Sequence, residues 1–234
     1  MKSMRYSKGQ GLVEYVLLIG LLVVGTALAL QLSGVRLSDV YCRTARIFSG
    51  EDVCAAVKYA CEDNFDAGLD GWTKGQGAWQ SKDGSACASG VGMIFDKCSA
   101  DLKPKDYTVQ VSGAHLTKGN GYGVFFRTTL NDKGQFNGYT FQYDPGYGGG
   151  AFIFRKWVNG RELPPFAVAP AKGYNWYGAP KDVAVSVQGN QFTAYIDGVP
   201  VLTASDSSYT QGGTGLRSWD SSQVCVDNFG ISIP

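Results

Sequence analysis

The chain has 234 residues and a mass of 25.1 kDa, which allows one domain with an appendage or two small domains. Its formal net charge is +1, so no electrostatic case exists for nucleic acid, and we expect no nucleic-acid partner. The 32 glycines, with 5 Trp, 13 Tyr and 12 Phe, predict short strands and glycine turns rather than a helical bundle.

A short basic segment opens the chain and precedes an apolar stretch over residues 16–32, in which Gln31 is the strongly polar residue. The stretch is close to the roughly 20 residues that cross a bilayer as a helix. Basic residues on its N-terminal side predict a cytoplasmic N-terminus. Glu14 lies at the start of this apolar helix, where a carboxylate is costly and usually functional. The basic residues are Lys2, Arg5 and Lys8.

The run KGQGLVEY, residues 8–15, resembles the class III leader of type IV pilins, especially the Flp/Tad branch. In that family the leader is cut after a glycine, and a glutamate followed by an aromatic residue lies five residues into the mature chain. The resemblance implies cleavage between Gly9 and Gln10. It also implies assembly roles for Gln10, Glu14 and Tyr15, with the new amine of Gln10 pairing with the Glu14 carboxylate.

This resemblance implies a leader over residues 1–9 and a helix over residues 10–49 that forms the filament core. The partners would be further copies of the chain in a helical homo-oligomer, prepilin peptidase and the pilus assembly machinery. The protein would be a single-pass protein of the cytoplasmic membrane before assembly and a surface pilus outside the cell afterwards. A plain membrane anchor with a stray glutamate is the alternative for the same residues.

Residues 50–60 are expected to form a linker, because the Ser49-Gly50 pair breaks the helical pattern. An even number of cysteines in an exported chain suggests three disulfides. The segment 53–61 reads as a helical turn or as a loop. In a regular helix Cys54 and Cys61 would lie about 10 Å apart along the axis, which favours Cys42–Cys54. The cysteines are Cys42, Cys54, Cys61, Cys87, Cys98 and Cys225.

The hydrophobic pattern changes to period two after Asp63, with Gly, Asn and Asp between the runs. The dipeptide Asp197-Gly198 predicts a hairpin turn. Many short strands with no helix between them indicate an antiparallel sandwich over residues 61–234, and with the N-terminal helix an α+β protein. The predicted strands cover residues 107–113, 122–128, 138–144, 151–158, 182–187, 191–197 and 223–233.

This region resembles concanavalin A-like jelly rolls, in particular laminin G-like and family-16-like domains of sugar-binding and sugar-cleaving proteins. The matching pieces are NFD with GW (64–72), GAW (77–79), YGVFFRT, NGYTFQYD, YIDGVPV and VDNFGI (226–231). In that fold the first and last strands are neighbours. The resemblance therefore implies a Cys61–Cys225 bridge, which leaves Cys87 to pair with Cys98.

Many sugar-binding sandwiches of this kind carry a structural Ca²⁺ where the first and last strands meet. Asp227 matches the acidic position usual there, and Asp63, Glu62 or Asp66 could complete the site. Apart from this calcium ion, no cofactor is expected.

Sugar sites use aromatic faces and planar polar groups. Period two puts Tyr139 and Tyr143 on one face of their strand, and Arg155 with Trp157 on one face of the next. One of these faces must be core, and the sequence does not decide which. The candidate glycan-binding residues are Tyr139, Tyr143, Arg155, Trp157, Trp176 and Trp219, with Tyr177 and Arg217 beside them.

Family-16 glycosidases need two carboxylates from a Glu-x-Asp-x-Glu strand. Here Glu162 is the single glutamate after residue 62, so we expect no enzyme. The favoured hypothesis is a filament subunit whose sandwich domain serves adhesion or glycan binding. The alternative is a membrane-anchored carbohydrate-binding protein that never polymerises, and a surface glycosidase is the least favoured.

Overall fold

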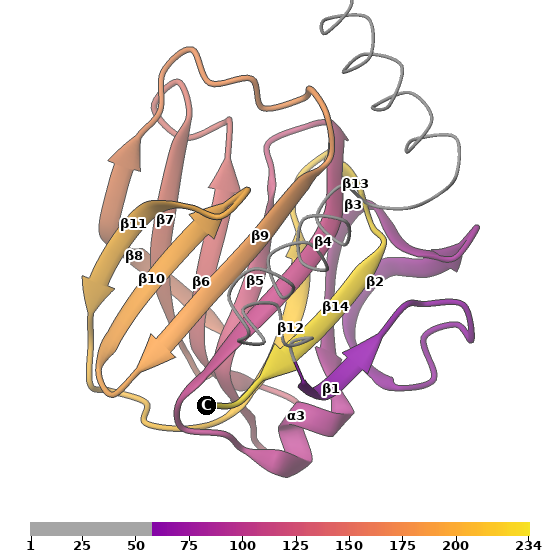
Figure 1. The fold of residues 1–234 in the computed structure, drawn as a ribbon, viewed down its shortest axis with the longest axis vertical. Helices are drawn as coiled ribbons and strands as arrows, with labels where there is room; N and C mark the ends of the chain where they lie inside the picture. The colour runs from indigo at the N-terminus through magenta and orange to yellow at the C-terminus, as the bar shows by residue number, and fades with distance from the viewer. Residues whose placement is uncertain (1–57) are drawn as a thin grey trace, which may run out of the picture. The chain divides into compact units, whose positions relative to one another are not determined.

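The computed structural model describes residues 58–234, which fold into a two-layered antiparallel β-sandwich (Figure 1). We call the front layer sheet A; its strands follow the order β1-β14-β4-β9-β10-β11. The layer behind it is sheet B, with the order β13-β3-β12-β5-β6-β7-β8, and β2 also pairs with β3. Strand β4 belongs to both sheets, because its first half pairs with β9 and β14 and its second half pairs with β13.

The strands of sheet A and the single short helix of the described residues have the following bounds. They are β1 (Tyr59–Asp63), α3 (Lys97–Leu102), β4 (Tyr107–Lys118), β9 (Lys181–Gln188), β10 (Gln191–Ile196), β11 (Val199–Ser205) and β14 (Asn228–Ser232). The strands of sheet B are β2 (Trp72–Lys82), β3 (Ser85–Asp96), β5 (Tyr122–Leu130), β6 (Phe136–Asp144), β7 (Ala151–Val158), β8 (Arg161–Pro170), β12 (Gly213–Ser218) and β13 (Gln223–Val226).

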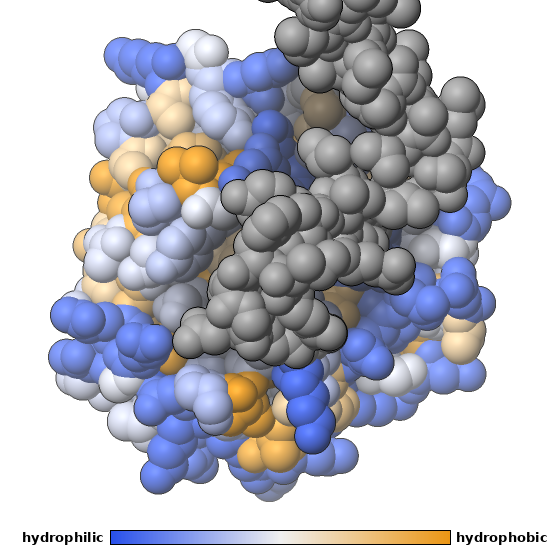
Figure 2. All heavy atoms as spheres, in the orientation of Figure 1, coloured by the Kyte–Doolittle hydropathy of each residue, from blue (hydrophilic) through white to orange (hydrophobic). Residues whose placement is uncertain are grey.

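The main core lies between the sheets and follows the period-two alternation of the strands. Val183, Val185 and Val187 of β9 point inward from sheet A, and the aromatic residues of β6 and β7 meet them from sheet B. Sheet B also buries its other face, since Phe95, Phe125, Phe136 and Trp157 form a second apolar cluster. The outer side of sheet A differs: in Figure 2 hydrophilic residues surround a few separate hydrophobic patches.

The predicted α+β class is wrong. The described residues are almost entirely β-structure, and their helix, α3, has 6 residues. No helix within residues 58–234 has the length and apolar character to cross a membrane. The helix predicted over residues 10–49 lies outside the described residues. The same holds for the leader, for Gly9, Gln10, Glu14 and Tyr15, and for the Cys42–Cys54 pair.

The predicted strands are confirmed, with one change and several additions. The closing run splits into β13 and β14, which lie in different sheets. Asp197 and Gly198 form the predicted two-residue hairpin turn, and both have positive φ. The sequence pattern missed β1, which is short. It also missed β2, β3, β8 and β12, because glycines, alanines and prolines interrupt their alternation.

The disulfides are Cys61–Cys98 and Cys87–Cys225, so both pairings expected for these four cysteines are wrong. Cys87 lies in the extended strand β3 and Cys98 just beyond its end, which places them roughly 30 Å apart at about 3.3 Å per residue. The first and last strands, β1 and β14, are neighbours as expected. Cys225, however, belongs to β13 and lies directly opposite Cys87 of β3.

A buried arginine closes one end of the sandwich. Arg127 has a positive φ of 50° and lies where the register of β5 and β6 shifts. Its guanidinium donates to the carbonyl oxygens of Lys105, Gly189 and Tyr209, which belong to three separate connections. These bonds tie the ends of both sheets together.

Candidate functional site

The structure decides which face of β6 and β7 is core. Tyr139 and Tyr143 point between the sheets and are fully buried there. Arg155 and Trp157 therefore lie on the outer face of sheet B, and the same alternation brings Thr140, Gln142 and Asp144 of β6 to that face.

Arg217 of β12 lies at the centre of this outer face. Its guanidinium carbon lies 4.7 Å from the ring centroid of Trp157 and 4.7 Å from that of Trp219, so two aromatic rings contact one cation. Its Nη1 atom donates to the Glu162 carboxylate. Burial lowers the pKa of Arg217, although the nearby Glu162 carboxylate opposes the shift.

Polar side chains from three strands surround the carboxylate of Glu162. Gln142 donates from Nε2 to Glu162 Oε1 at 2.6 Å, and Arg155 donates from Nε to Gln142 Oε1 at 2.9 Å. The Arg155 Nε atom also lies 3.7 Å from Glu162 Oε1. We call Gln142, Arg155, Glu162 and Arg217 the polar cluster.

The Arg217–Glu162 contact shows that sheet B is strongly curved. Along the sheet, β5, β6 and β7 separate β12 from β8, which is four steps of about 4.8 Å, or about 19 Å. The two side chains meet nonetheless, so the sheet curls around them. The outer face of sheet B is therefore concave, and we call it the concave face.

The loop after β6 forms the rim of the polar cluster. Asp144 accepts hydrogen bonds from the backbone N–H groups of Gly146 and Tyr147, which hold the loop in a tight turn. Burial raises the pKa of the Asp144 carboxyl to about 6, even though Arg155 and Arg217 lower it. The Tyr147 ring, 39% exposed, lies 5.6 Å from the Arg155 guanidinium carbon.

Several buried donors on the concave face lack a partner. Arg217 Nε, Trp157 Nε1 and Thr140 Oγ1 have no hydrogen-bond partner within the part of the chain that the structure describes. Buried polar groups are normally satisfied. Gly123 of β5 leaves room for the Arg217 stem, since a Cβ there would lie 3.2 Å from Arg217 Cγ. The face thus combines aromatic surface with unused hydrogen-bonding capacity.

The candidate glycan-binding residues divide into two groups. Arg155, Trp157 and Trp219 come together on the concave face, with Arg217 between the two tryptophans. Tyr139, Tyr143 and Trp176 lie elsewhere, in the main core, where the Tyr143 hydroxyl donates to the Trp176 carbonyl. Our assignment of these three to a ligand site is therefore wrong, because their side chains are buried among other core residues.

From the sequence we did not predict Gln142 and Asp144 as site residues, and we discussed Glu162 only as a catalytic residue. The available signal was the alternation of Gln142 and Asp144 with the aromatic residues of β6, which puts polar side chains on the opposite face.

The two carboxylates expected to hold calcium have other partners. Asp63 accepts from the Phe65 backbone and from Trp72 Nε1, and Asp227 accepts from the Ser85 hydroxyl. Within residues 58–234, neither belongs to a group of three ligating side chains close enough to share an ion. The calcium site stays a prediction.

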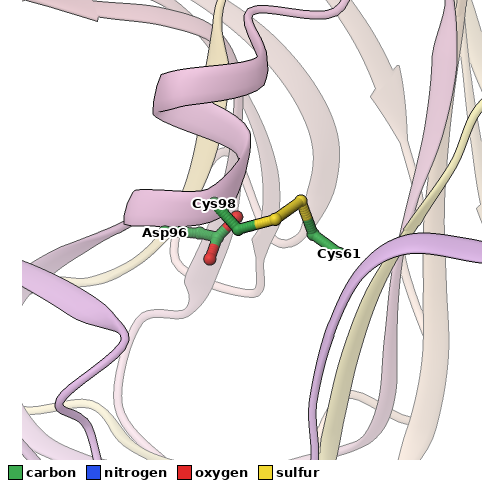
Figure 3. Close-up of side chains that lie close together, drawn as sticks. All are labelled: Cys61, Asp96 and Cys98. Atoms are coloured by element: carbon green, nitrogen blue, oxygen red, sulfur yellow. A yellow bond between two sulfur atoms is a disulfide. The ribbon is translucent and has the colours of Figure 1, made fainter.

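Residues 58–234 contain one group of three potential metal ligands, but its two sulfur atoms are already bonded to each other. Cys61 of β1 and Cys98 of α3 meet as a disulfide beside Asp96 (Figure 3). Asp96 is the N-cap of α3 and accepts from the Ser99 backbone N–H. Disulfide sulfurs are not thiolate ligands, so this group fastens β1 to α3 instead of holding a metal.

Comparison with known families matches residues 62–232 to the 3-keto-alpha-glucoside-1,2-lyase-like domain. The chain belongs to this family. The match covers every strand of the sandwich except the start of β1, and it includes the polar cluster. No curated protein matches the chain.

Solved structures agree with the fold of this lyase-like domain. It is similar to the carbohydrate-binding module CBM66 from Bacillus subtilis, with 21% identity and a TM-score of 0.58 over 70% of this chain and 97% of the other. A Bacillus licheniformis beta-glucanase shares 13% identity and a TM-score of 0.55 over 76% and 99% of the two chains. At these identities the likeness establishes the jelly-roll fold alone.

Proposed function

We propose that the lyase-like domain binds carbohydrate on its concave face. The observation that carries this proposal is the partly exposed Trp219 ring stacked on Arg217, beside Gln142 and Arg155. The buried Trp157 ring contacts Arg217 from the second apolar cluster. Aromatic rings stack on the apolar faces of sugars, and planar amide and guanidinium groups bond to their hydroxyls. The partly exposed Arg155 guanidinium supplies donors for such bonds. The fold shared with a carbohydrate-binding module supports the same assignment.

Binding without cleavage is the favoured form of this function. Glu162 accepts hydrogen bonds from Gln142 and Arg217 and lies 3.7 Å from Arg155 Nε, so the protein itself already engages its carboxylate. A glycosidase instead needs a free carboxylate opposite a protonated one.

A second candidate is cleavage of a glycosidic bond, as the family description and the beta-glucanase fold suggest. One observation favours it. Asp144 and Glu162 are two carboxyl groups near the same arginines, and burial raises the pKa of Asp144 to about 6, as is typical of a general acid.

A glycan array, followed by calorimetry on the glycans that bind, tests the proposal. We expect Trp219→Ala and Gln142→Ala to weaken binding at least tenfold. Val199→Ala, which changes a side chain 61% exposed on β11, is the matched control and should bind as the unaltered chain does. Retained affinity in both concave-face variants would contradict the proposal. Chromatography of each bound glycan after long incubation distinguishes binding from cleavage.

The filament role rests on residues 1–57, which lie outside the described residues. Polymerisation, prepilin peptidase, the assembly machinery and the membrane stage therefore stay predictions of the sequence. Glycan binding by the sandwich does not depend on them. The two disulfides are typical of a domain exposed outside the cell, where surface glycans are accessible.

A further inference from the structure

We infer that the concave face selects a sugar that carries a carboxylate, held by Arg155 above the buried Arg217. This inference rests on the proposed glycan binding and specifies the chemistry of the ligand.

The charges of the polar cluster do not balance. Arg155 and Arg217 both contact the single carboxylate of Glu162, and arginine stays protonated in proteins. These three side chains therefore carry one excess positive charge. The buried Arg217 makes the direct contact with Glu162, so the excess charge falls on Arg155, which is only partly exposed. An anionic ligand would supply the missing charge.

The donor groups of the two guanidiniums that have no partner in the described part of the chain are also suited to bind a carboxylate. Arg217 uses Nη1 for Glu162, while its Nε has no partner among residues 58–234. Arg155 uses Nε for Gln142 and Nη1 for the Leu163 carbonyl, and it remains partly exposed at 18%. The exposed guanidinium is the group that a ligand meets first. Planar guanidinium groups bind carboxylates through paired, charge-assisted hydrogen bonds.

Asp144 makes this selection depend on pH. It is the further acidic group near the two arginines, and its own turn already occupies Oδ1. When Asp144 is ionised, the net charge of Arg155, Arg217, Glu162 and Asp144 is zero. When Asp144 is protonated, the net charge is +1. The groups around it are Arg155, Arg217, Glu162 and the Tyr147 backbone. A sugar carboxylate, with a pKa of about 3 to 4, remains ionised at pH 5.

The test compares acidic oligosaccharides with their own methyl esters, which are neutral and nearly the same shape. Glucuronate, galacturonate and mannuronate oligomers serve as probes, with the full chain, at pH 5 and low salt. We expect at least one acid to bind about tenfold more tightly than its ester. The difference should shrink in 0.5 M NaCl, because salt screens partly exposed charges.

Variants identify the groups responsible. Arg155→Gln should bring the ratio of acid affinity to ester affinity close to one, and Arg155→Lys should keep part of that ratio. Asp144→Asn should keep the preference at pH 7 at the level that the unaltered chain shows at pH 5. If glycans bind but no acid is preferred over its ester, or if Arg155→Gln keeps the preference, this inference is wrong and glycan binding stands. If neither acidic nor neutral glycans bind, the proposed function itself fails.

Discussion

The guanidinium carbon of Arg217 lies 4.7 Å from the ring centroid of Trp157, although their strands, β12 and β7, are not neighbours in the sheet. Curvature of sheet B brings the two side chains together. Glu162 of β8 completes the arrangement by accepting from Arg217. The contact therefore links the stability of the curved sheet to the integrity of the candidate site.

Replacing Arg217 should destabilise the domain. We expect Arg217→Ala to lower the free energy of unfolding by about 3 kcal/mol, because it removes the stacking on two rings and leaves Glu162 with one cation fewer. Urea unfolding measures the change. The double variant with Glu162→Gln should lose less than the sum of the two single variants. Simple additivity would show that the pair does not interact.

We predict that a glycine is needed at position 123 to leave space for the Arg217 side chain. A Cβ at this position would lie 2.8 Å from Thr140 Cγ2 and 2.7 Å from the Phe141 carbonyl oxygen. Gly123→Ala should therefore cost about 1–3 kcal/mol, as overpacked sites do, and it should weaken glycan binding. Gly71→Ala is the control, because its Cβ would meet Asp63 at an ordinary 3.7 Å. Equal free energies of unfolding for Gly123→Ala and Gly71→Ala would show that position 123 does not require a glycine.

Arg127 should be among the most sensitive positions outside the site. Arg127→Met removes hydrogen bonds to three carbonyl oxygens and leaves them near the apolar end of the sandwich. We expect a loss of about 3–5 kcal/mol, measured by thermal or urea unfolding. Arg161→Met changes an exposed arginine at the start of β8 and should alter stability by less than about 0.5 kcal/mol.

Peptide mapping should identify the two disulfides, and they should contribute unequally to the free energy of unfolding. A non-reducing digest should link the peptide of Cys87 to that of Cys225, and the peptide of Cys61 to that of Cys98. Chain-entropy estimates give about 5 kcal/mol for the first bridge and about 4 kcal/mol for the second, because the first closes the longer loop. A peptide that joins Cys61 to Cys225 would contradict the structure.

Stability should fall as the pH rises from about 4 to about 6. Burial raises the pKa of Asp144 from its usual 3.8 to about 6, so in this window the folded state binds more protons than the unfolded state. Each pH unit there costs up to about 1.4 kcal/mol, and above the window the loss is complete. Asp144→Asn should reduce this slope in urea titrations, and the remainder belongs to Asp96, whose pKa burial also raises. An unchanged slope in the variant would assign it to another group.

The main strands and the hairpin at Asp197-Gly198 were predictable, because period-two alternation and a two-residue turn are local properties. The disulfide pairs were not. Cys225 and Cys87 pair because the closing segment stays in sheet B through β13 and crosses to sheet A only at β14, and that path depends on contacts with β3 and β4. The burial of Arg127 was also not predictable, because it depends on the register shift in β5 that turns the side chain inward.

The sequence by itself determined that residues 61–234 form an antiparallel sandwich, and that Tyr139 with Tyr143, and Arg155 with Trp157, share faces of their strands. Only the tertiary structure decided which face is core and which is the site. Both faces of sheet B are rich in aromatic residues, so local hydrophobicity cannot distinguish them. The distinction arises from the position of sheet A and from the curvature that brings Glu162 to Arg217.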